Sequence, residues 1–182
     1  MKRIFLVGYM GAGKTTLGKL LADKLNLEFI DLDHYIENSY HKTVGSIFAE
    51  KGEEEFRLIE SNMLHEVGEF ESVLIATGGG TPCFHDNMEY MNKQGITVYL
   101  KTAPEVLHRR LRIAKAKRPL LRGKSDQELM DFICMNLERR SLMYEKSVLV
   151  FNADKLDTYE ELEHSVNLLA ELVLKCLSAD YR

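Results

Sequence analysis

Short apolar runs alternate with longer amphipathic stretches along the 182-residue chain. The run at residues 4–7 is apolar at every position, which is typical of a strand covered on both faces of a sheet. In residues 16–25, leucines instead recur at helical spacing. Such alternation predicts an α/β fold, in which helices cover both faces of a parallel sheet. The predicted strands are residues 2–7, 28–31, 72–76, 96–100 and 147–151.

Length, hydropathy and charge limit the classes of protein to which this chain can belong. A chain of this length without repeats or low-complexity linkers is expected to form one domain, residues 1–182. No stretch reaches the roughly 20 apolar residues of a membrane span. The N-terminal residues are not expected to form a signal peptide, because Gly8 and Lys14 interrupt the apolar run. The net charge of −4 does not favour bulk binding to nucleic acid.

The cysteines suggest a cellular compartment. Their number is odd and their spacing is not that of metal ligands, so we expect a reducing environment and buried rather than reactive thiols. No strong dimer surface is evident from the sequence. We therefore expect a cytoplasmic monomer that binds neither membrane nor nucleic acid. The cysteines are Cys83, Cys134 and Cys176.

A glycine-rich stretch, residues 8–16, joins the first predicted strand to the first predicted helix. Its sequence, Gly-Tyr-Met-Gly-Ala-Gly-Lys-Thr-Thr, has the spacing of a phosphate-binding loop. Backbone N–H groups and the helix N-terminus would surround phosphates, Lys14 would reach the β- and γ-phosphates, and Thr15 would hold Mg²⁺. A glycine turn with only a structural role is the alternative. The expected ATP contacts are Gly11, Ala12, Gly13, Lys14, Thr15 and Thr16.

Two aspartates follow the second predicted strand. Asp31 and Asp33 face the same side if the extended conformation continues. One carboxylate could then hold a metal-bound water, and the other could bind a substrate hydroxyl. The third strand ends at Thr77 without an acid, so Asp31 is the candidate for the metal-associated acid. For Asp33, capping of a helix that begins at His34 is an equally good interpretation on local grounds.

A second glycine cluster follows the third predicted strand. Glycine allows the backbone to approach a ligand closely, so these residues are candidates for substrate contacts. A flexible turn is the alternative. The cluster consists of Gly78, Gly79 and Gly80.

Two arginines lie on predicted helices. In the helix at residues 53–65, Arg57 and Glu60 are three residues apart and can pair, with a solvated surface pair as the alternative. The later helix starts with a capping box at Ser125. If it extends far enough, Arg140 lies on its apolar side, where an arginine requires an anion from the protein or from a ligand.

Eight of the 24 basic residues lie between positions 109 and 124, without an acid among them. Pro119 and Gly123 predict a loop in this segment. Next to a phosphate-binding loop, such a segment could be a lid that brings an arginine onto the transferred phosphoryl group. A solvated run of charge is the alternative.

Together these stretches resemble the shikimate kinase family over residues 1 to about 154. The resemblance implies a three-layer fold with five parallel strands in the order 2-3-1-4-5, as in nucleoside monophosphate kinases. It also implies a shikimate-binding part at about residues 32–61, a mobile lid at about 112–124, and ATP-dependent phosphorylation of the 3-hydroxyl of shikimate in chorismate and aromatic amino-acid biosynthesis. The matching segments are residues 8–16, Asp31-Leu-Asp33, Phe56-Arg57 with Glu60, residues 78–80, Arg118-Pro-Leu-Leu121, and Arg140 with Tyr144.

The same resemblance implies roles for these residues. Arg57 and Arg140 would bind the shikimate carboxylate, and the residues around Gly79 would contact shikimate through their backbone. Asp33 would bind the shikimate hydroxyls; whether it accepts the proton of the attacking hydroxyl stays open. Arg118 would be the lid arginine on the phosphates. Thr15 would ligate Mg²⁺ directly and Asp31 would do so through water.

The chain departs from the family pattern at the position of the arginine that helps to hold adenine. That position falls on Leu111, so either Arg110 or Arg112 is a candidate for the contact. Two other functions stay open at this point. One is phosphorylation of another small molecule, such as gluconate or a nucleotide, by a kinase of the same fold. The other is a nucleotide-binding regulator whose basic loop docks a partner.

Overall fold

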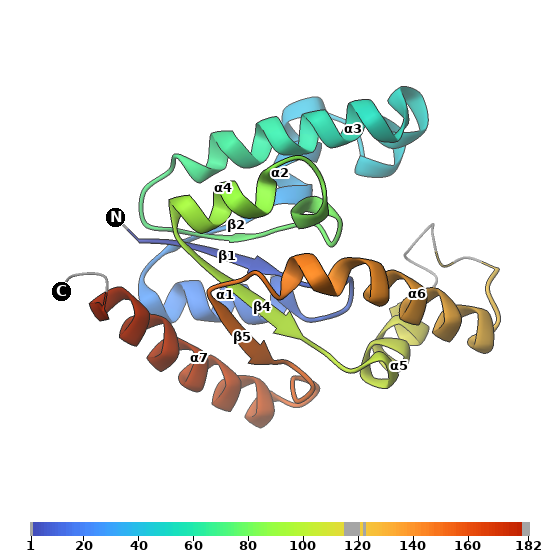
Figure 1. Ribbon diagram of the computed structural model, residues 1–182. Helices are drawn as coiled ribbons and strands as arrows, with labels where there is room; N and C mark the ends of the chain where they lie inside the picture. Colours follow the sequence, from blue (N-terminus) through green and yellow to red (C-terminus); the bar gives the residue numbers. More distant parts are fainter. Residues whose placement is uncertain (1, 115–120, 122, 180–182) are drawn as a thin grey trace.

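The computed structural model describes residues 2–114, 121 and 123–179. Its strands form one sheet in the order β2-β3-β1-β4-β5, and all neighbouring strands are parallel (Figure 1). This result confirms the predicted α/β fold and the strand order. The strands are β1 (Arg3–Val7), β2 (Glu28–Asp31), β3 (Val73–Ala76), β4 (Ile96–Lys101) and β5 (Leu149–Asn152).

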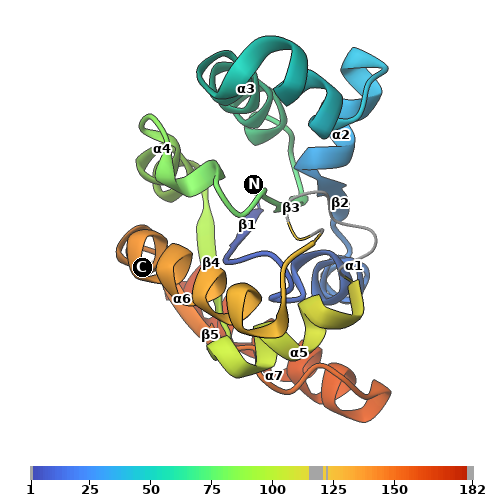
Figure 2. The same cartoon turned by 90° about the vertical axis from the view of Figure 1, so that its right-hand side faces the viewer.

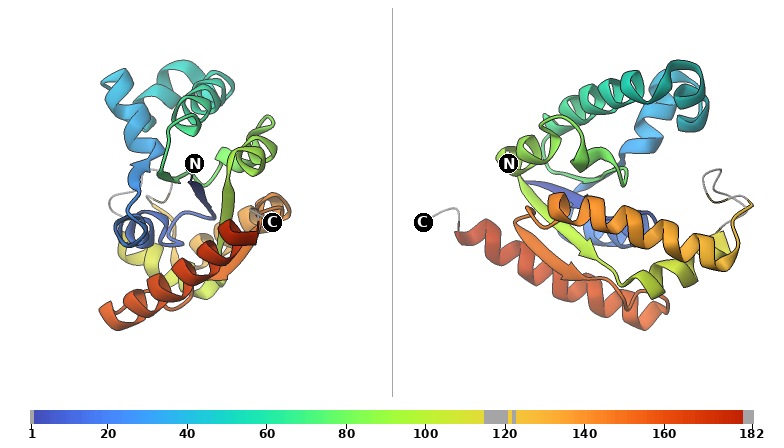
Figure 3. Two further views of the ribbon diagram at one scale, coloured as in Figure 1. Left: turned by 90° about the vertical axis from the view of Figure 1, so that its left-hand side faces the viewer. Right: turned by 45° about the vertical axis from the view of Figure 1, so that its right-hand side comes forward.

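Helices pack on both sides of the sheet. α1 and α7 lie against each other on one side, whereas α3 and α4 lie against each other on the other (Figures 1 and 2). α5 packs against α6, which runs along the front of the molecule in the right-hand view of Figure 3. The helices are α1 (Lys14–Leu25), α2 (Leu32–Tyr40), α3 (Val44–Gly68), α4 (Asn87–Gln94), α5 (Pro104–Ala114), α6 (Asp126–Tyr144) and α7 (Tyr159–Ala179), with a 3₁₀ turn, η1, at Thr81–Cys83.

The central strand, β1, and its neighbour β3 are almost entirely buried in the core. Residues 4–7 of β1 are fully buried, and the four residues of β3 are at most 2% exposed. Two parallel strands covered on both faces require this kind of uninterrupted apolar run, which is why the sequence predicted them well. Phe56 and Ile59 of α3 join the same core, as their helical spacing predicts.

The helix that follows β2 begins two residues earlier than expected. Asp31 is its N-cap, and the Asp31 carboxylate accepts a hydrogen bond from the backbone N–H of His34 across 3.5 Å. Asp33 lies inside the first turn of α2 and is therefore not the cap. The strand and the helix share residue 31, because a cap residue keeps the extended conformation while its side chain bonds the first turn.

Both arginines lie inside helices, and the helix that contains Arg57 is longer than the sequence predicted. The expected helix at residues 53–65 is the second part of α3, which is broken at Gly52. The capping box at Ser125 is present, and α6 continues to Tyr144, so Arg140 is helical. None of the helices in the described part of the chain is long and apolar enough to cross a membrane. The expectation of buried cysteines is wrong for Cys134, which is exposed, while Cys83 and Cys176 are half-buried.

Candidate active site

The phosphate loop, residues 8–16, connects β1 to the N-terminus of α1. Gly13 is the N-cap of α1 and has a φ of 96°, which strains any residue with a side chain. A Cβ atom at Gly13 would also lie 2.7 Å from Leu156 Cδ1. The Nζ atom of Lys14 donates to the carbonyl oxygens of Gly8 at 2.8 Å and Tyr9 at 3.0 Å. The lysine thus lies over the loop, with its charge at the end of β1.

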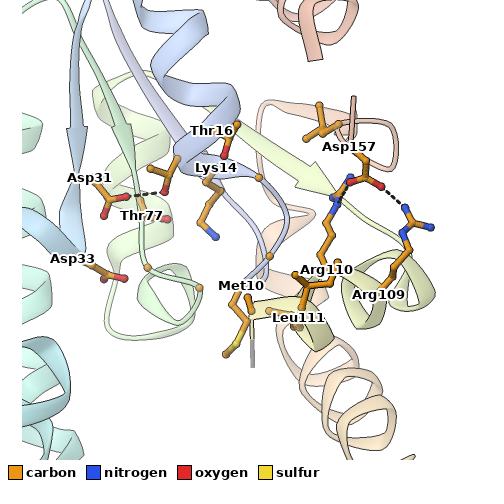
Figure 4. Close-up of a pocket in the computed structure, with 18 residues that line it drawn as sticks. Met10, Lys14, Thr16, Asp31, Asp33, Thr77, Arg109, Arg110, Leu111 and Asp157 are labelled. Atoms are coloured by element: carbon orange, nitrogen blue, oxygen red, sulfur yellow. Dashed lines mark hydrogen bonds and ion pairs between the residues drawn. The ribbon is translucent and has the colours of Figure 1, made fainter. Parts of the chain in front are cut away.

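A cavity of about 630 Å³ opens beside this loop (Figure 4). It extends from the ends of β2 and β3 on one side to α5 and the segment before α7 on the other. This is the carboxyl edge of the parallel sheet, where ligands bind in folds of this kind. Its walls consist of Met10, Gly11, Gly13, Lys14, Thr15, Thr16, Asp31, Asp33, Thr77, Gly78, Gly79, Arg109, Arg110, Leu111, Ile113, Ala114, Leu156 and Asp157.

Two oxygen ligands meet at the start of α1. The Thr15 hydroxyl donates a 2.7 Å hydrogen bond to the carboxylate of Asp31, the residue labelled at the end of β2 in Figure 4. Hydroxyl and carboxylate oxygens are the donors that Mg²⁺ prefers. In the described residues no group of three or more His, Cys, Asp or Glu side chains could hold a metal. The pair therefore suits an ion that is held mainly by phosphate and water oxygens, as Mg²⁺ usually is.

Asp33 lines the same cavity, on the first turn of α2 (Figure 4). The surrounding protein raises the pKa of its carboxyl to about 6, because partial removal from water disfavours the charged form. The negative charges of Asp31 and Glu60 act in the same direction, and Lys14 opposes them. Asp33 is therefore a stronger base than an ordinary carboxylate.

Arg57 is held rigidly from α3. Its Nη1 atom donates to Glu60 at 2.8 Å, and its Nη2 atom lies 3.4 Å from Glu53. Its guanidinium also lies 4.1 Å from the centre of the Phe84 ring. The Arg57 side chain is 12% exposed and that of Glu60 only 2%. The alternative of a solvated surface pair is therefore wrong, because the tertiary structure encloses both partners.

Arg140 comes from α6 and meets the glycine cluster from a different side. Its Nη1 atom donates to the carbonyl oxygen of Gly79 at 3.3 Å, and the Tyr144 hydroxyl donates to the same oxygen. Its guanidinium lies 5.8 Å from the centre of the Tyr9 ring. In the described part of the chain no carboxylate forms an ion pair with Arg140.

The glycine cluster thus separates the cavity from the two arginines. Gly78 and Gly79 line the cavity, whereas Arg57 and Arg140 are not among the residues of its wall. A Cβ atom at Gly80 would lie 2.7 Å from Arg57 Nη1, so the backbone at that position and the guanidinium are in close contact. The structure brings Lys14, Asp33 and both arginines around one short turn.

A buried hydrogen-bond network fixes this turn, and sequence reasoning missed it. Thr81 donates to Glu60 at 2.6 Å, and the side-chain amide of Asn87 donates to the carbonyl oxygen of Thr81 at 2.9 Å. Ser61 donates to Asn87 at 2.7 Å. No sequence motif marks these residues, and only their burial in the folded protein indicates their role.

The far end of the cavity separates the two candidates for the adenine contact. Arg110 lines the cavity, and its guanidinium bonds Asp157 at 2.7 Å and the carbonyl oxygen of Ala153 at 3.0 Å. Arg112 is exposed, lies 3.5 Å from Asp126 and is not in the wall. Leu156 and Asp157, which no sequence motif marks, also contribute to the cavity. The predicted lid arginine, Arg118, lies outside the described residues.

Known proteins of similar sequence agree on one family. A family model described as shikimate kinase matches residues 10–172. A shikimate kinase of Bacteroides thetaiotaomicron is 61% identical over 173 residues, which cover 95% of this chain and 99% of that protein. Another, from Flavobacterium psychrophilum, is 40% identical and covers 89% of this chain and 97% of its own length.

Solved structures give the same result. The crystal structure of the Bacteroides thetaiotaomicron shikimate kinase superposes with a TM-score of 0.92, covering 94% of this chain and 97% of that chain. The structure of an Acinetobacter baumannii shikimate kinase in complex with shikimate is 32% identical, with a TM-score of 0.80, and covers 99% of this chain and 94% of that chain.

Proposed function

The chain belongs to the shikimate kinase family, and from this premise we propose how its residues phosphorylate shikimate. The reaction transfers the γ-phosphoryl group of ATP to the 3-hydroxyl of shikimate, yielding shikimate 3-phosphate and ADP. It belongs to chorismate and aromatic amino-acid biosynthesis. The observation that carries this assignment is the 61% identity to a shikimate kinase over nearly the full length of both chains.

ATP binds along the cavity with its phosphates at the phosphate loop. The backbone N–H groups of residues 11–16 and the N-terminus of α1 attract the phosphate oxygens. Lys14 exchanges its bonds to the loop carbonyls for bonds to the β- and γ-phosphates. Its charge then stabilises the negative charge of the transferred group. Arg110 lies at the opposite end of the cavity and is our candidate for the adenine contact.

Shikimate binds at the glycine turn, opposite the phosphates. Arg57 and Arg140 reach this turn from two helices, and two guanidinium groups suit one planar carboxylate. The backbone of residues 78–80 contacts the shikimate ring, since glycine allows that close approach. The acceptor hydroxyls would face Asp33, which lines the cavity beside Gly78.

The chemical step is an in-line displacement. The 3-hydroxyl oxygen forms a bond to the γ-phosphorus, and the bond between that phosphorus and the bridging oxygen of ADP breaks. Asp33 orients the attacking hydroxyl and accepts its proton, for which the raised pKa of Asp33 suits it. Catalysis depends mainly on positioning and charge, because such transition states need little help from a base.

Mg²⁺ would be held by the Thr15 hydroxyl directly and by Asp31 through a water molecule. The 2.7 Å contact between these two side chains supports the assignment. When bound, the ion would neutralise phosphate charge. The test is an Asp31→Ala variant, which should need more Mg²⁺ for half-maximal rate. An unchanged Mg²⁺ requirement would exclude Asp31 from metal binding.

Several predictions rest on the sequence alone. Arg118 would close over the transferred phosphoryl group as part of a lid at about residues 112–124, and residues 32–61 would form the acceptor-binding part of one domain. The three cysteines form no disulfide in the described structure, in keeping with the cytoplasmic location that we propose. A monomer is our proposal for the oligomeric state.

The proposed function is tested by coupled measurement of ADP release. Release should depend on both Mg²⁺-ATP and shikimate, and shikimate methyl ester should be a much poorer acceptor because it lacks the anionic group. ATP binding without acceptor-dependent ADP release would instead indicate a nucleotide-binding regulator. A preference for gluconate or a nucleotide over shikimate would indicate a kinase with another acceptor.

A further inference from the structure

Arg57 and Arg140 are neutralised to different degrees by the protein. Arg57 has Glu60 and Glu53 as ion-pair partners, and its guanidinium lies 4.1 Å from the centre of the Phe84 ring and 5.3 Å from that of Phe56. Arg140 is half-buried and, in the described residues, has no carboxylate partner. The orientation of Arg140 therefore depends on contacts that are weaker than an ion pair, and those contacts determine the direction in which its guanidinium points.

One of those contacts comes from the phosphate loop itself. Tyr9 is the second residue of that loop, is 1% exposed, and presents its ring to the Arg140 guanidinium at 5.8 Å. An aromatic face at this distance attracts a cation without neutralising it. The tyrosine hydroxyl is buried and makes no hydrogen bond within the described structure. The contact of the Tyr9 side chain with Arg140 is therefore made by the ring.

The backbone of Tyr9 fixes the position of this ring. Its carbonyl oxygen accepts hydrogen bonds from Lys14 Nζ at 3.0 Å and from the Ala12 N–H at 3.1 Å. A Cβ atom at Gly79 would lie 3.3 Å from the backbone nitrogen of Met10, so the glycine turn rests directly on the loop. The Gly79 carbonyl in turn accepts from Arg140. The phosphate loop therefore contacts Arg140 both through Gly79 and through the Tyr9 ring.

We propose that Tyr9 is a positioning residue for Arg140, so that the phosphate loop forms part of the acceptor's anion site as well as the nucleotide site. The ring holds one face of the guanidinium, and the Gly79 carbonyl holds one of its edges. The other edge is then directed at a carboxylate bound on the glycine turn. This inference rests on the proposed role of Arg140 in binding the shikimate carboxylate.

The experiment compares two ligands, shikimate and its uncharged methyl ester, by calorimetric titration. Tyr9→Leu should raise the Kd for shikimate roughly 5- to 10-fold, the range expected for a cation–π contact to a half-buried arginine. The Kd for the ester should change less than about 2-fold, because no anion is involved. Tyr9→Phe keeps the ring and should preserve both values, with a melting temperature at least as high as that of the wild type.

Two further variants make the result specific. Tyr90→Leu removes a tyrosine ring that stacks on His65 instead of on Arg140 and should leave the preference for shikimate over the ester unchanged. Adding Tyr9→Leu to Arg140→Leu should cause no further loss of preference, because the residue to be positioned is absent.

Each result has a defined meaning. An equal loss of affinity for both ligands in Tyr9→Leu, or an unchanged preference, would overturn the positioning role and leave Tyr9 as a packing residue. If Arg140→Leu by itself keeps the full preference for shikimate, the proposed role of Arg140 fails instead. Loss of preference in Arg140→Leu with an unaltered preference in Tyr9→Leu would refute only the inference about Tyr9.

Discussion

Arg57 and Gly80 are in such close contact that a Cβ atom on the glycine would lie 2.7 Å from Nη1 of the arginine. Gly80 has an ordinary φ of −94°, so its backbone would accept alanine without strain. Arg57 cannot move away easily, because Glu60 and the Phe84 ring hold it. Glycine is therefore needed at position 80 because a side chain there would collide with Arg57, and not because the turn requires an unusual backbone conformation.

Gly80→Ala should displace Arg57 and raise the KM for shikimate by roughly tenfold or more, since small misplacements of a positioning group are costly. The KM for ATP should change little. Steady-state kinetics with each substrate varied would measure both values. Gly45→Ala is the matched control, because the nearest heavy atom to its Cβ would be 3.9 Å away, and its kinetics should equal those of the wild type. An unaltered shikimate KM in Gly80→Ala would contradict the placement of Arg57 in the acceptor site.

Arg57→Leu and Arg140→Leu should both weaken shikimate binding but should differ in stability. Removing Arg57 leaves Glu60, which is 2% exposed, without its ion-pair partner, at a cost of about 3 kcal/mol. Removing Arg140 leaves no buried carboxylate behind in the described structure, so its unfolding free energy should change by less than about 1 kcal/mol. Urea denaturation and calorimetric titration would measure the two effects.

A second substitution tests the reason for this difference. Glu60→Gln should recover part of the stability that Arg57→Leu loses, because it removes the uncompensated charge. Equal destabilisation by the two arginine variants would show that the Arg57–Glu60 pair does not have the assigned energetic role.

Asp33→Ala should lower kcat by about 100-fold or more, because the variant loses both the orientation of the attacking hydroxyl and the acceptor of its proton. The KM for ATP should stay within a few-fold of the wild-type value, because the phosphates are held by the loop. Asp23→Ala, at an exposed position on α1, is the control for loss of a carboxylate. Near-normal turnover by Asp33→Ala would remove this residue from the chemical step.

The raised pKa of Asp33 also predicts a dependence of stability on pH in the protein without ligands or metal. Its pKa rises from the ordinary 3.8 to about 6 on folding, so the ionised form is disfavoured in the folded state. This cost is fully present above about pH 6, falls as the pH drops from 6 towards 3.8, and vanishes only well below 3.8, where the carboxyl is protonated in both states. Because Asp33 is exposed to the cavity, solvent screening reduces the cost to about 1 kcal/mol.

Asp33→Asn should therefore be more stable than the wild type at pH 7.5 and should lose most of this advantage by pH 4. Thermal melts of both proteins in EDTA over this range would measure the difference. An advantage that grows as the pH falls would contradict the raised pKa.

Much of the proposed nucleotide site is predictable from sequence because its parts are contiguous. The strand, phosphate loop and first helix occupy one short segment, and the apolar runs of β1 and β3 follow directly from burial on both faces. The resemblance of separate segments to the shikimate kinase family also supplied the strand order, which local patterns do not contain.

At the start of α2, local sequence patterns did not decide the role of Asp33. The sequence left open whether this residue caps the following helix or binds substrate. The structure makes Asp31 the cap and leaves Asp33 facing the cavity. The sheet decides this, because β2 pairs with β3 up to residue 31 and the chain can turn only after that position.

By itself the sequence predicted the phosphate loop, the alternation of strands and helices, and the two arginines that we propose bind an anionic acceptor. Only the tertiary structure decided how those arginines are held: Arg57 by a buried carboxylate three residues away, and Arg140 by a carbonyl 61 residues distant and by a ring of the phosphate loop. The physical reason is that spacing along the chain determines which side chains share a helix face. The charge that a residue presents to a ligand depends on the neighbours that folding brings to it from other elements.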